Sequence, residues 1–275
     1  MKHVFMIPVA LLLAGCPKDI DVRKVSDSVS KLSESSREQT DEEEIEIGTA
    51  IAARLVGAAP LVRNDHVQRY VNQVGRWVAQ QSERTELPWR FAVLDSADLN
   101  AFAIPGGFVF ITQGLLESMQ NEAELAGVLG HEISHVLRQH HLRAIRKQNR
   151  IGAATDLVSS FIGDKKDQKV FDKLVGAGTQ LYARGLDKDD ELEADRMGVV
   201  LAARAGYDPY GLPAVLQTIQ AKSTQDPALA LMLKTHPAPG ARLDLLEKVM
   251  PKALERYAGQ PAVAARFVRE VSATP

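Results

Sequence analysis

The chain has 275 residues, a formal net charge of −2 and 45% hydrophobic residues. This composition is typical of an ordinary soluble body, and without a basic excess we expect no nucleic-acid partner. Cys16 is the sole cysteine, which excludes a framework of disulfide bonds within the chain. No internal repeat is found, so one domain is expected.

The first residues have the pattern of an export signal. A cationic start precedes an apolar run from Val4 to Leu13, which is shorter than the roughly twenty residues of a membrane-spanning helix. The run leads into Leu13-Ala14-Gly15-Cys16, which resembles the lipobox of bacterial lipoproteins. That resemblance implies a signal peptide over residues 1–15 and a lipidated Cys16. A buried free thiol after ordinary export is the alternative.

The segment after the predicted lipid anchor separates it from the folded body. Residues 16–40 are rich in Ser, Lys, Asp and Glu and are predicted to be a tether. Valines and a leucine at helical spacing leave a weak amphipathic helix open as the alternative to a flexible segment. The folded body is predicted at residues 41–250, followed by a C-terminal tail at 251–275.

Apolar periodicity predicts that most elements of this body are helices. One expected face combines Val67, Val71, Val74, Trp77 and Val78. Strands are predicted where aromatic and β-branched residues gather, with a turn at 105–107 that interrupts pairing. The expected fold class is therefore α+β, mainly helical, with a small sheet. The predicted helices are 41–59, 64–81, one that begins at 121, 189–205 and 240–250, and the predicted strands are 89–94 and 108–112.

The helix predicted to begin at Asn121 contains the motif His131-Glu132-Ile133-Ser134-His135, of the form HExxH. Residues four apart share one face of a helix, so both histidines can present a ring nitrogen to one metal ion. Glu132 is then placed to accept a proton from water. Asn121 and Glu124 predict a capping box at the helix start. The alternative is a pair of hydrogen-bonded core histidines with a solvated glutamate.

Another predicted helix supplies two carboxylates at the same spacing, Glu191 and Asp195. Zinc in a hydrolase usually has three protein ligands and an open position, so one carboxylate can complete the set. The other can accept the free N–H of a ligand histidine. An acidic helix start, which the helix dipole favours, is the simpler alternative. It explains the acidity but not its combination with HExxH.

These motifs, in this order, resemble those of the HtpX/BepA/LoiP family of bacterial zinc metallopeptidases, relatives of the type I CAAX prenyl protease. The segment 191–195 is similar to the E-x-x-A-D of that family. Similarity extends to the segments 100–107 (NAFAIPGG), 205–209 (AGYDP) and 235–239 (THPAP) with Arg242. The resemblance implies a gluzincin-like fold with the small sheet beside the HExxH helix. The chain is most similar to the short form of the family, without a helical repeat domain.

The resemblance also implies the roles of individual residues. One Zn²⁺ per chain is expected on His131, His135 and Glu191, with Asp195 as the hydrogen-bond partner of a ligand histidine. In BepA-like relatives the histidine that corresponds to His236 approaches the metal and blocks the open position. Support of the oxyanion of the tetrahedral intermediate is a second role for His236, and simple packing in a proline-rich turn is the alternative.

An extended or unfolded polypeptide is the expected substrate. An exposed sheet edge near the metal can hold such a chain by main-chain hydrogen bonds. The residues expected to contact it are Asn100, Ala101, Phe102, Gly106 and Gly107, and the alternative is that these are plain core and turn residues.

With Glu132 as the base, the predicted function is zinc-dependent endopeptidase activity, and the resemblance implies misfolded or stalled proteins of the bacterial cell envelope as its substrates. The second position of the predicted lipoprotein, directly after Cys16, is Pro17 and not Asp, which by the usual sorting pattern of such lipoproteins favours the outer membrane, facing the periplasm. Outer-membrane protein assembly factors are expected partners. The rival is a periplasmic chaperone that holds clients in the same cleft with little proteolysis. A structural zinc site with His236 as fourth ligand is a further alternative.

The remaining histidines and a basic run are given no role at the metal. His140 follows His135 by five residues and is expected off the ligand face, and His66 is expected at the surface. A solvated helix C-terminus explains the basic run better than contact with anionic head groups does. The run comprises Arg138, His140, His141, Arg143, Arg146, Lys147 and Arg150.

Overall fold

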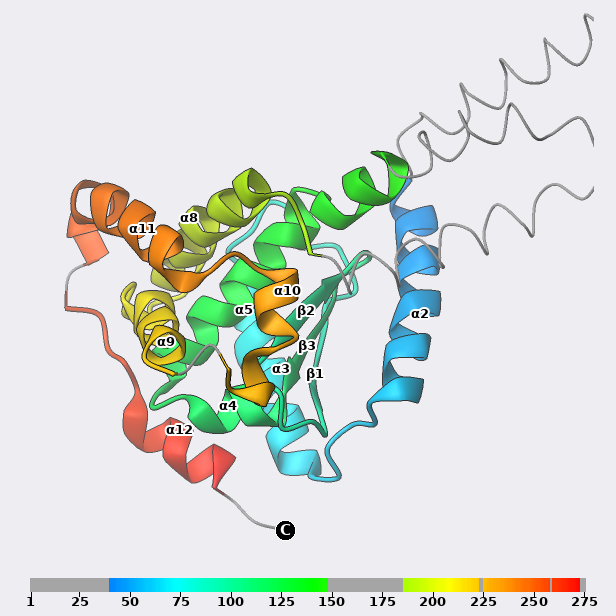
Figure 1. Ribbon diagram of the computed structural model, residues 1–275, viewed down its shortest axis with the longest axis horizontal. Helices are drawn as coiled ribbons and strands as arrows, with labels where there is room; N and C mark the ends of the chain where they lie inside the picture. Colours follow the sequence, from blue (N-terminus) through cyan, green and yellow to red (C-terminus); the bar gives the residue numbers. More distant parts are fainter. Residues whose placement is uncertain (1–39, 148–184, 223–224, 258, 273–275) are drawn as a thin grey trace, which may run out of the picture. The chain divides into compact units, whose positions relative to one another are not determined.

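A computed structural model of the chain describes residues 40–147, 185–222, 225–257 and 259–272. The predicted signal peptide, Cys16 and the tether up to residue 39 lie outside the described residues, as does Arg150. Over the ranges that are described, no helix combines the length and apolar character needed to cross a membrane. The prediction of a mainly helical α+β fold with a small sheet is confirmed (Figure 1).

The predicted helices and strands correspond to observed elements whose ends differ from the predictions by at most three residues. In chain order the elements are α2 (Asp41–Ala58), α3 (Asp65–Ala79), β1 (Arg90–Leu94), β2 (Ala101–Ile104), β3 (Phe108–Thr112), α4 (Gln113–Ser118), α5 (Glu122–Leu137), α8 (Lys188–Arg204), α9 (Gly211–Gln220), the 3₁₀ turn η1 (Pro227–Leu229), α10 (Met232–Thr235), α11 (Pro239–Ala253), the 3₁₀ turn η2 (Glu255–Tyr257) and α12 (Ala264–Val271).

The sheet seen in the described residues has the strand order β1-β3-β2, so β2 is an edge strand. β1 and β3 are parallel, while β2 and β3 form an antiparallel hairpin in which Ile104 pairs with Phe108. Gly106 and Gly107 have φ angles of 79° and 90°, which favour glycine and explain the turn. The predicted turn therefore closes a hairpin and does not interrupt pairing. The extra strand, β2, escaped the residue-based prediction because its two alanines weaken the strand signal.

Alternating side chains of the sheet enter two different apolar clusters. Val93, Ala103 and Ile111 face the main core with α3 and α5. Leu94 and Ile104, from the opposite face, pack with α2 and with the helical residues 140–147. Figure 1 shows α2 on one side of the sheet and α5 on the other. Because both faces are covered, the strands are apolar at nearly every position.

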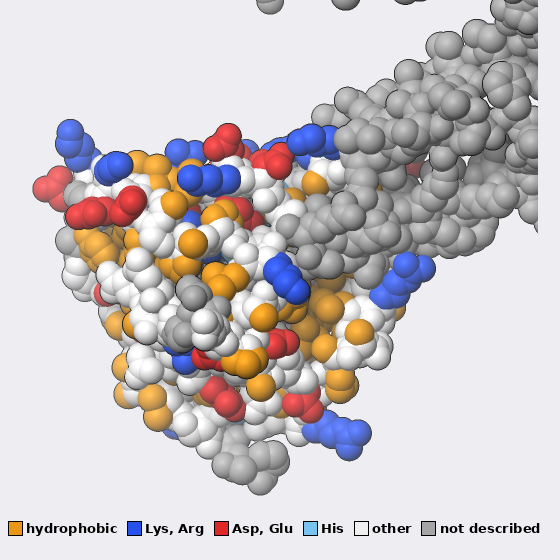
Figure 2. Space-filling model, viewed as in Figure 1, with side chains coloured by type: hydrophobic (Ala, Val, Ile, Leu, Met, Phe, Trp, Pro, Cys, Tyr) orange, Lys and Arg blue, Asp and Glu red, His pale blue; other side chains and the backbone are white. Residues whose placement is uncertain are grey.

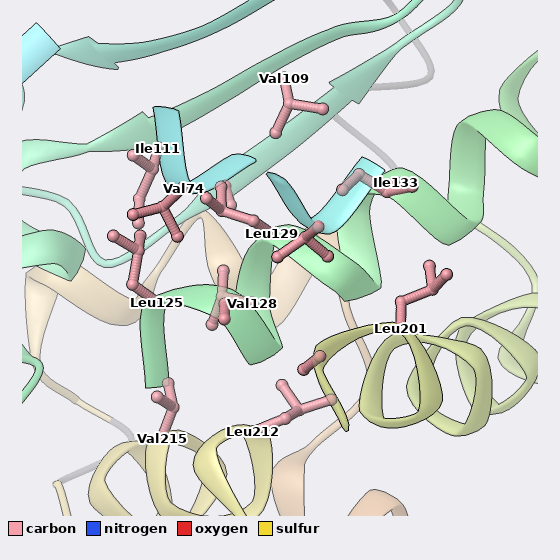
Figure 3. Close-up of a cluster of buried hydrophobic side chains, with 14 of the residues drawn as sticks. Val74, Val109, Ile111, Leu125, Val128, Leu129, Ile133, Leu201, Leu212 and Val215 are labelled. Atoms are coloured by element: carbon pink, nitrogen blue, oxygen red, sulfur yellow. The ribbon is translucent and has the colours of Figure 1, made fainter. Parts of the chain in front are cut away.

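Helix α5 is the centre of the main core, and every one of its residues is buried. Figure 3 shows α5 between the sheet and α3 on one side and α8 and α9 on the other. Asn121 caps its start by accepting the amide of Glu124, which is one half of the predicted capping box; the Glu124 carboxylate accepts the backbone amide of Gln120 and not that of Asn121. Polar residues of α5 are therefore enclosed by protein, where an unpaired imidazole or carboxylate would be costly.

One side chain of α3 lies differently from what the sequence pattern suggests. Trp77, expected on the core face of α3, is 51% exposed. Its indole nitrogen donates to the carbonyl of Ala205 at 2.7 Å, so it anchors α3 to the end of α8 by its edge.

The segment predicted as a C-terminal tail contains α12, which docks on the core. Phe267 is 2% exposed, and Arg266 makes an ion pair with the buried Glu122 of α5. Elsewhere the surface is ordinary: Figure 2 shows basic and acidic side chains interspersed on the viewed face, in keeping with the net charge of −2.

Candidate metal centre

Helices α5 and α8 approach each other so closely that their backbones touch. A Cβ atom added to Gly198 would lie 2.5 Å from the backbone nitrogen of His131, and one added to Gly130 would lie 2.6 Å from the carbonyl oxygen of Gly198. Only glycine fits at these two positions. The contact brings His131 of α5 opposite Asp195 and Glu191, which lie about one and two turns before Gly198 on α8.

Four side chains meet beside this contact, and each offers one metal-binding atom. The Nε2 atoms of His131 and His135 are 3.0 Å apart. The carboxylate of Glu191 lies 3.6 Å from the first and 3.5 Å from the second. His236 Nε2 lies 3.9 Å from the same carboxylate. All four donor atoms lie within 4.8 Å of one another.

The geometry and chemistry of this group fit a metal ion. Tetrahedral ligands at about 2.0–2.1 Å from a zinc-sized ion are about 3.4 Å apart, close to the observed separations. His131, His135 and Glu191 are at most 3% exposed. In the described part of the chain Glu191 Oε2 has no hydrogen-bond partner, although it is buried. A carboxylate oxygen in that condition is expected to bind a cation.

A buried ion pair between Asp195 and Arg242 lies at the Nδ1 side of the His131 ring. Its Nδ1 lies 2.9 Å from Asp195, and Arg242 of α11 donates to both oxygens of Asp195 at 2.8 and 2.6 Å. Burial alone would raise the pKa of Asp195, but the charge and hydrogen bonds of Arg242 hold that pKa well below its usual range. Sequence patterns assigned Arg242 no role beyond its place in a similar motif. Nothing in the local pattern indicates that its side chain reaches the core.

Glu132 lies between the donor group and the edge strand β2. Glu132 is 3% exposed, and its carboxylate accepts the backbone amide of Ala103. Burial, supported by the charge of Glu191, raises the pKa of Glu132 to about 7, although nearby positive charges oppose the shift. A carboxylate with this pKa can exchange protons readily near neutral pH.

His236 follows α10 and closes the opposite side of the group. Its Nδ1 lies 2.9 Å from the hydroxyl of Thr235, and its Nε2 lies 3.9 Å from Glu132. Burial lowers the pKa of His236 to about 4, so the ring is neutral at pH 7 and has a lone pair to offer. The structure therefore places all of the predicted ligands, the predicted base and His236 together.

Two adjoining pockets open beside Glu132 and His236. The first is lined by Ala101, Phe102 and Ala103 of the edge strand. The second is largely apolar, with Asn100 at its wall beside leucine and valine side chains. Asn100 is 1% exposed, and neither polar atom of its side-chain amide has a hydrogen-bond partner within the described ranges. The apolar lining includes Leu115, Val128, Leu212, Val215, Leu216 and Ile219.

The other two predicted substrate residues lie in the hairpin turn and line neither pocket. The amide of Gly106 donates to the buried Glu44 of α2 at 2.9 Å, and Gly107 is next to Trp89. The structure gives both glycines a role in the turn, and their contact with a substrate stays a prediction.

His140 lies much closer to the site than its spacing suggests. Helix α5 ends at Leu137, and Gln139 has a φ of 50°, which turns the chain back. His140 is completely buried, with its Nδ1 2.8 Å from Nδ1 of His135. The expectation that it lies off the ligand face assumed a continuous helix. A helix end of this kind, at a non-glycine residue, leaves little signal in the sequence.

The basic run after HExxH pairs with the acidic start of α8. Arg143 contacts Asp190 at 2.7 Å, and Lys147 contacts Asp187 at 3.1 Å. Arg138 similarly lies 3.1 Å from Glu193. The two charged segments that looked independent in the sequence therefore neutralise each other. His66 is at the surface, as predicted, and contacts Glu270 of α12.

Comparison with known proteins agrees with this arrangement. The model of peptidase family M48 matches residues 65–250. The chain is 32% identical over 208 residues to the beta-barrel assembly-enhancing protease of Escherichia coli (strain K12), a match that covers 73% of this chain and 42% of the relative. It is 35% identical over 182 residues to the mitochondrial metalloendopeptidase OMA1 of Arabidopsis thaliana, which covers 65% of this chain and 36% of the relative.

The matched region spans less than half the length of these relatives. It includes all the residues of the candidate metal centre, both helices that carry them and the edge strand. The family implies a metal ion, and the donor group of this chain could hold one. On these grounds the chain belongs to peptidase family M48, a family of metallopeptidases.

Proposed function

We propose that the chain is a zinc-dependent endopeptidase that cleaves polypeptides bound in an extended form. One observation carries the proposal: the carboxylate of Glu132 lies between the metal-binding group and the edge strand β2, and it accepts an amide of that strand. A base and a group that could hold a metal thus adjoin one edge of the sheet, and we propose that a peptide backbone pairs with this edge, whose four residues are buried in the structure. These are the parts that metal-assisted peptide hydrolysis needs.

The chemistry would depend on zinc held by His131, His135 and Glu191. When bound, zinc would polarise the scissile carbonyl and lower the pKa of an attacking water. Glu132 accepts a proton from that water at its carboxylate and delivers it to the nitrogen of the departing amine. Its pKa of about 7 suits both steps, because the group can gain and lose a proton near neutral pH. Asp195 keeps the ring of His131 oriented through their hydrogen bond.

Substrate binding is assigned to the residues beside Glu132. Ala101 and Phe102 of the edge strand line the first pocket, and we expect them to contact an extended backbone. The amide of Asn100 would hydrogen-bond the backbone of the substrate, because in the part of the chain that is described its polar atoms are buried and unsatisfied. The second, apolar pocket would take an apolar side chain next to the scissile bond.

His236 is proposed to gate the metal. Its neutral ring is close enough to Glu191 to belong to the donor group, and four donors would complete a tetrahedral set. Catalysis needs an open position, so His236 must move away for water or substrate to bind. Its removal is therefore expected to raise the rate of cleavage. A fall in rate would instead favour the role at the oxyanion.

The relatives and the N-terminal pattern support a proposed setting for the reaction. Because one relative is a beta-barrel assembly-enhancing protease, misfolded or stalled envelope proteins are the proposed substrates, and assembly factors of outer-membrane proteins are proposed partners. Lipidation at Cys16 would anchor the protein to the outer membrane, facing the periplasm. Blocking lipidation by Cys16→Ala should release the protein from membrane fractions.

The test is cleavage of unfolded casein by the full-length protein before and after zinc removal with a chelator. The proposal predicts that chelation abolishes cleavage and that about one zinc per chain restores it. His236→Ala should then cleave faster at the same zinc content. Cleavage that persists without metal would contradict the proposal. Bound zinc with suppressed aggregation of casein but no cleavage, in either form, would favour the client-holding alternative.

A further inference from the structure

The two histidines of the HExxH motif have different partners at Nδ1, the ring nitrogen that does not face the metal-binding group. His131 Nδ1 lies 2.9 Å from a carboxylate oxygen of Asp195. His135 Nδ1 instead lies 2.8 Å from Nδ1 of a third histidine, His140. A hydrogen bond between two imidazole nitrogens needs one N–H donor and one lone-pair acceptor. The proton in this bond must therefore belong to one ring or the other.

Metal binding decides which ring holds it. The Nε2 atom of His135 faces the site, since it lies 3.0 Å from His131 Nε2 and 3.5 Å from Glu191. A metal on Nε2 uses that lone pair, so the neutral ring carries its proton on Nδ1. That N–H donates to Nδ1 of His140, which must then be unprotonated.

The proton of His140 is consequently on Nε2, where two carboxylates face it. Glu193 lies at 3.4 Å and Asp190 at 3.5 Å from this atom. Both carboxylates are also held by arginines, Glu193 by Arg138 and Asp190 by Arg143. His140 is completely buried, so water does not compete for its bond to His135.

We propose that His140 is a positioning residue of the metal centre. It acts through His135: as an acceptor at Nδ1 it fixes the tautomer and the orientation of that ligand ring, and it relays the negative charge of Glu193 and Asp190 to it. This inference rests on the proposed zinc site. The partner of a ligand histidine is most often a carboxylate or a carbonyl, as Asp195 is for His131, so an imidazole in this position is a distinct arrangement.

The same proton count excludes a second metal at a neighbouring group of the described residues. His140, Asp190 and Glu193 present donors within 4.8 Å of one another and could be taken for one. A metal on Nε2 of His140 would place that ring's proton on Nδ1, where it would meet the Nδ1 proton of His135 across 2.8 Å. Loading both sites would break the bond between the rings, so one metal per chain is expected.

The test is zinc affinity of the full-length protein, measured by competition with a chromophoric chelator, for the parent, His140→Asn and His140→Leu. The oxygen of an asparagine amide takes nearly the position of a histidine Nδ1 and can accept the same bond, whereas leucine fills the space without an acceptor. We expect His140→Leu to bind zinc about 10–100-fold more weakly. His140→Asn should bind close to the parent value. The opposite order, or equal binding by all three, would overturn the proposal.

Controls separate this result from other causes. Thermal unfolding of the zinc-free variants reports any general damage to the fold, and His66→Leu, at the exposed histidine, should leave zinc affinity unchanged. Two zinc ions per chain in the parent would contradict the assigned protons. A parent that binds no zinc would instead contradict the proposed function itself. Equal zinc binding by the parent and the variants would contradict only the role of His140.

A measurement on the unaltered protein keeps the proposal testable if a variant does not fold. Long-range ¹H–¹⁵N correlation spectra of zinc-loaded protein labelled at histidine distinguish the tautomers of each ring. His140 should carry its proton on Nε2 and His135 on Nδ1. A proton on Nδ1 of His140 would refute the assignment.

Discussion

At the scale of single residues, Asp195 and Arg242 beside the candidate metal centre balance each other's charge inside the core. Asp195 is fully buried and forms a bidentate pair with Arg242, while it also accepts from His131. Removing one partner of such a pair leaves the other charge buried and uncompensated, which is strongly destabilising. Asp195 thus serves both the fold and the metal, and the two contributions can be separated.

Asp195→Asn should lower the free energy of unfolding by about 3–5 kcal/mol, because Arg242 loses its counter-charge. It should also weaken zinc binding about 10–100-fold, because the partner of His131 becomes neutral. The double variant Asp195→Asn, Arg242→Met removes the stranded charge. Urea unfolding and zinc competition should show recovery of stability without recovery of zinc affinity. Recovery of both would mean that Asp195 acts only by balancing Arg242.

Asn100→Ala should lower the activity without lowering the stability. The described residues offer no partner to its buried amide, so its loss should leave the melting temperature unchanged or raised. Cleavage of a peptide should lose about tenfold in kcat/KM, the value of roughly one hydrogen bond. Asn64→Ala is the matched control, because Asn64 caps α3. That variant should lose about 1 kcal/mol of stability and keep its kcat/KM; an Asn100 variant with the same pattern would exclude the substrate role.

At the scale of elements, the crossing of α5 and α8 sets the distance between the ligands. The Cβ of Gly198→Ala would come within 2.5 Å of the backbone of His131, so the helices must move apart. We expect a loss of about 1–3 kcal/mol in stability and a clear loss of zinc affinity. Gly57→Ala in α2, where nothing lies within 4 Å, should be neutral or stabilising in the same two assays. Unchanged zinc affinity in the Gly198 variant would show that the close contact does not position the ligands.

At the scale of the whole molecule, one buried carboxylate ties the C-terminal helix to the core. Glu122 of α5 accepts from Tyr70 of α3 at 2.8 Å and from Tyr207 at 2.7 Å, and it pairs with Arg266 of α12. Burial would raise the pKa of Glu122, but the hydrogen bonds of Arg266 and the two tyrosines outweigh it and lower the pKa. The three parts are therefore held together most strongly when Glu122 is ionised.

This shift predicts a pH dependence of stability. A depressed pKa contributes stability that is complete above the usual value of about 4.3 and is lost as pH falls through the folded-state pKa. Urea unfolding from pH 7 to 3 should show the parent more stable than Glu122→Gln near neutral pH, with the difference shrinking in acid. Glu86→Gln, at an exposed glutamate, should run parallel to the parent. A difference that grows in acid would contradict the lowered pKa.

Much of this molecule could be predicted because its strongest signals are local. The apolar period of α3 and the HExxH spacing depend on residues within a few turns, and both survive in the structure. The docking of α12 depends on contacts between distant segments, whereas the edge strand and the chain reversal at Gln139 have weak local signals, alanines in the one and a non-glycine residue at positive φ in the other. Arg242 and His140 became visible only when those contacts were known, because their partners lie on other elements or beyond a helix end.

The most direct test of the account is the cleavage rate of Glu132→Gln at a zinc content matched to that of the parent. Glutamine keeps the size and the hydrogen-bonding capacity of the side chain but cannot accept and release the proton. The account predicts that zinc remains bound while kcat falls about 10²–10⁴-fold, the usual value of a general base. A variant that binds zinc and cleaves at the parent rate would contradict the assignment of Glu132 and the peptidase mechanism built on it.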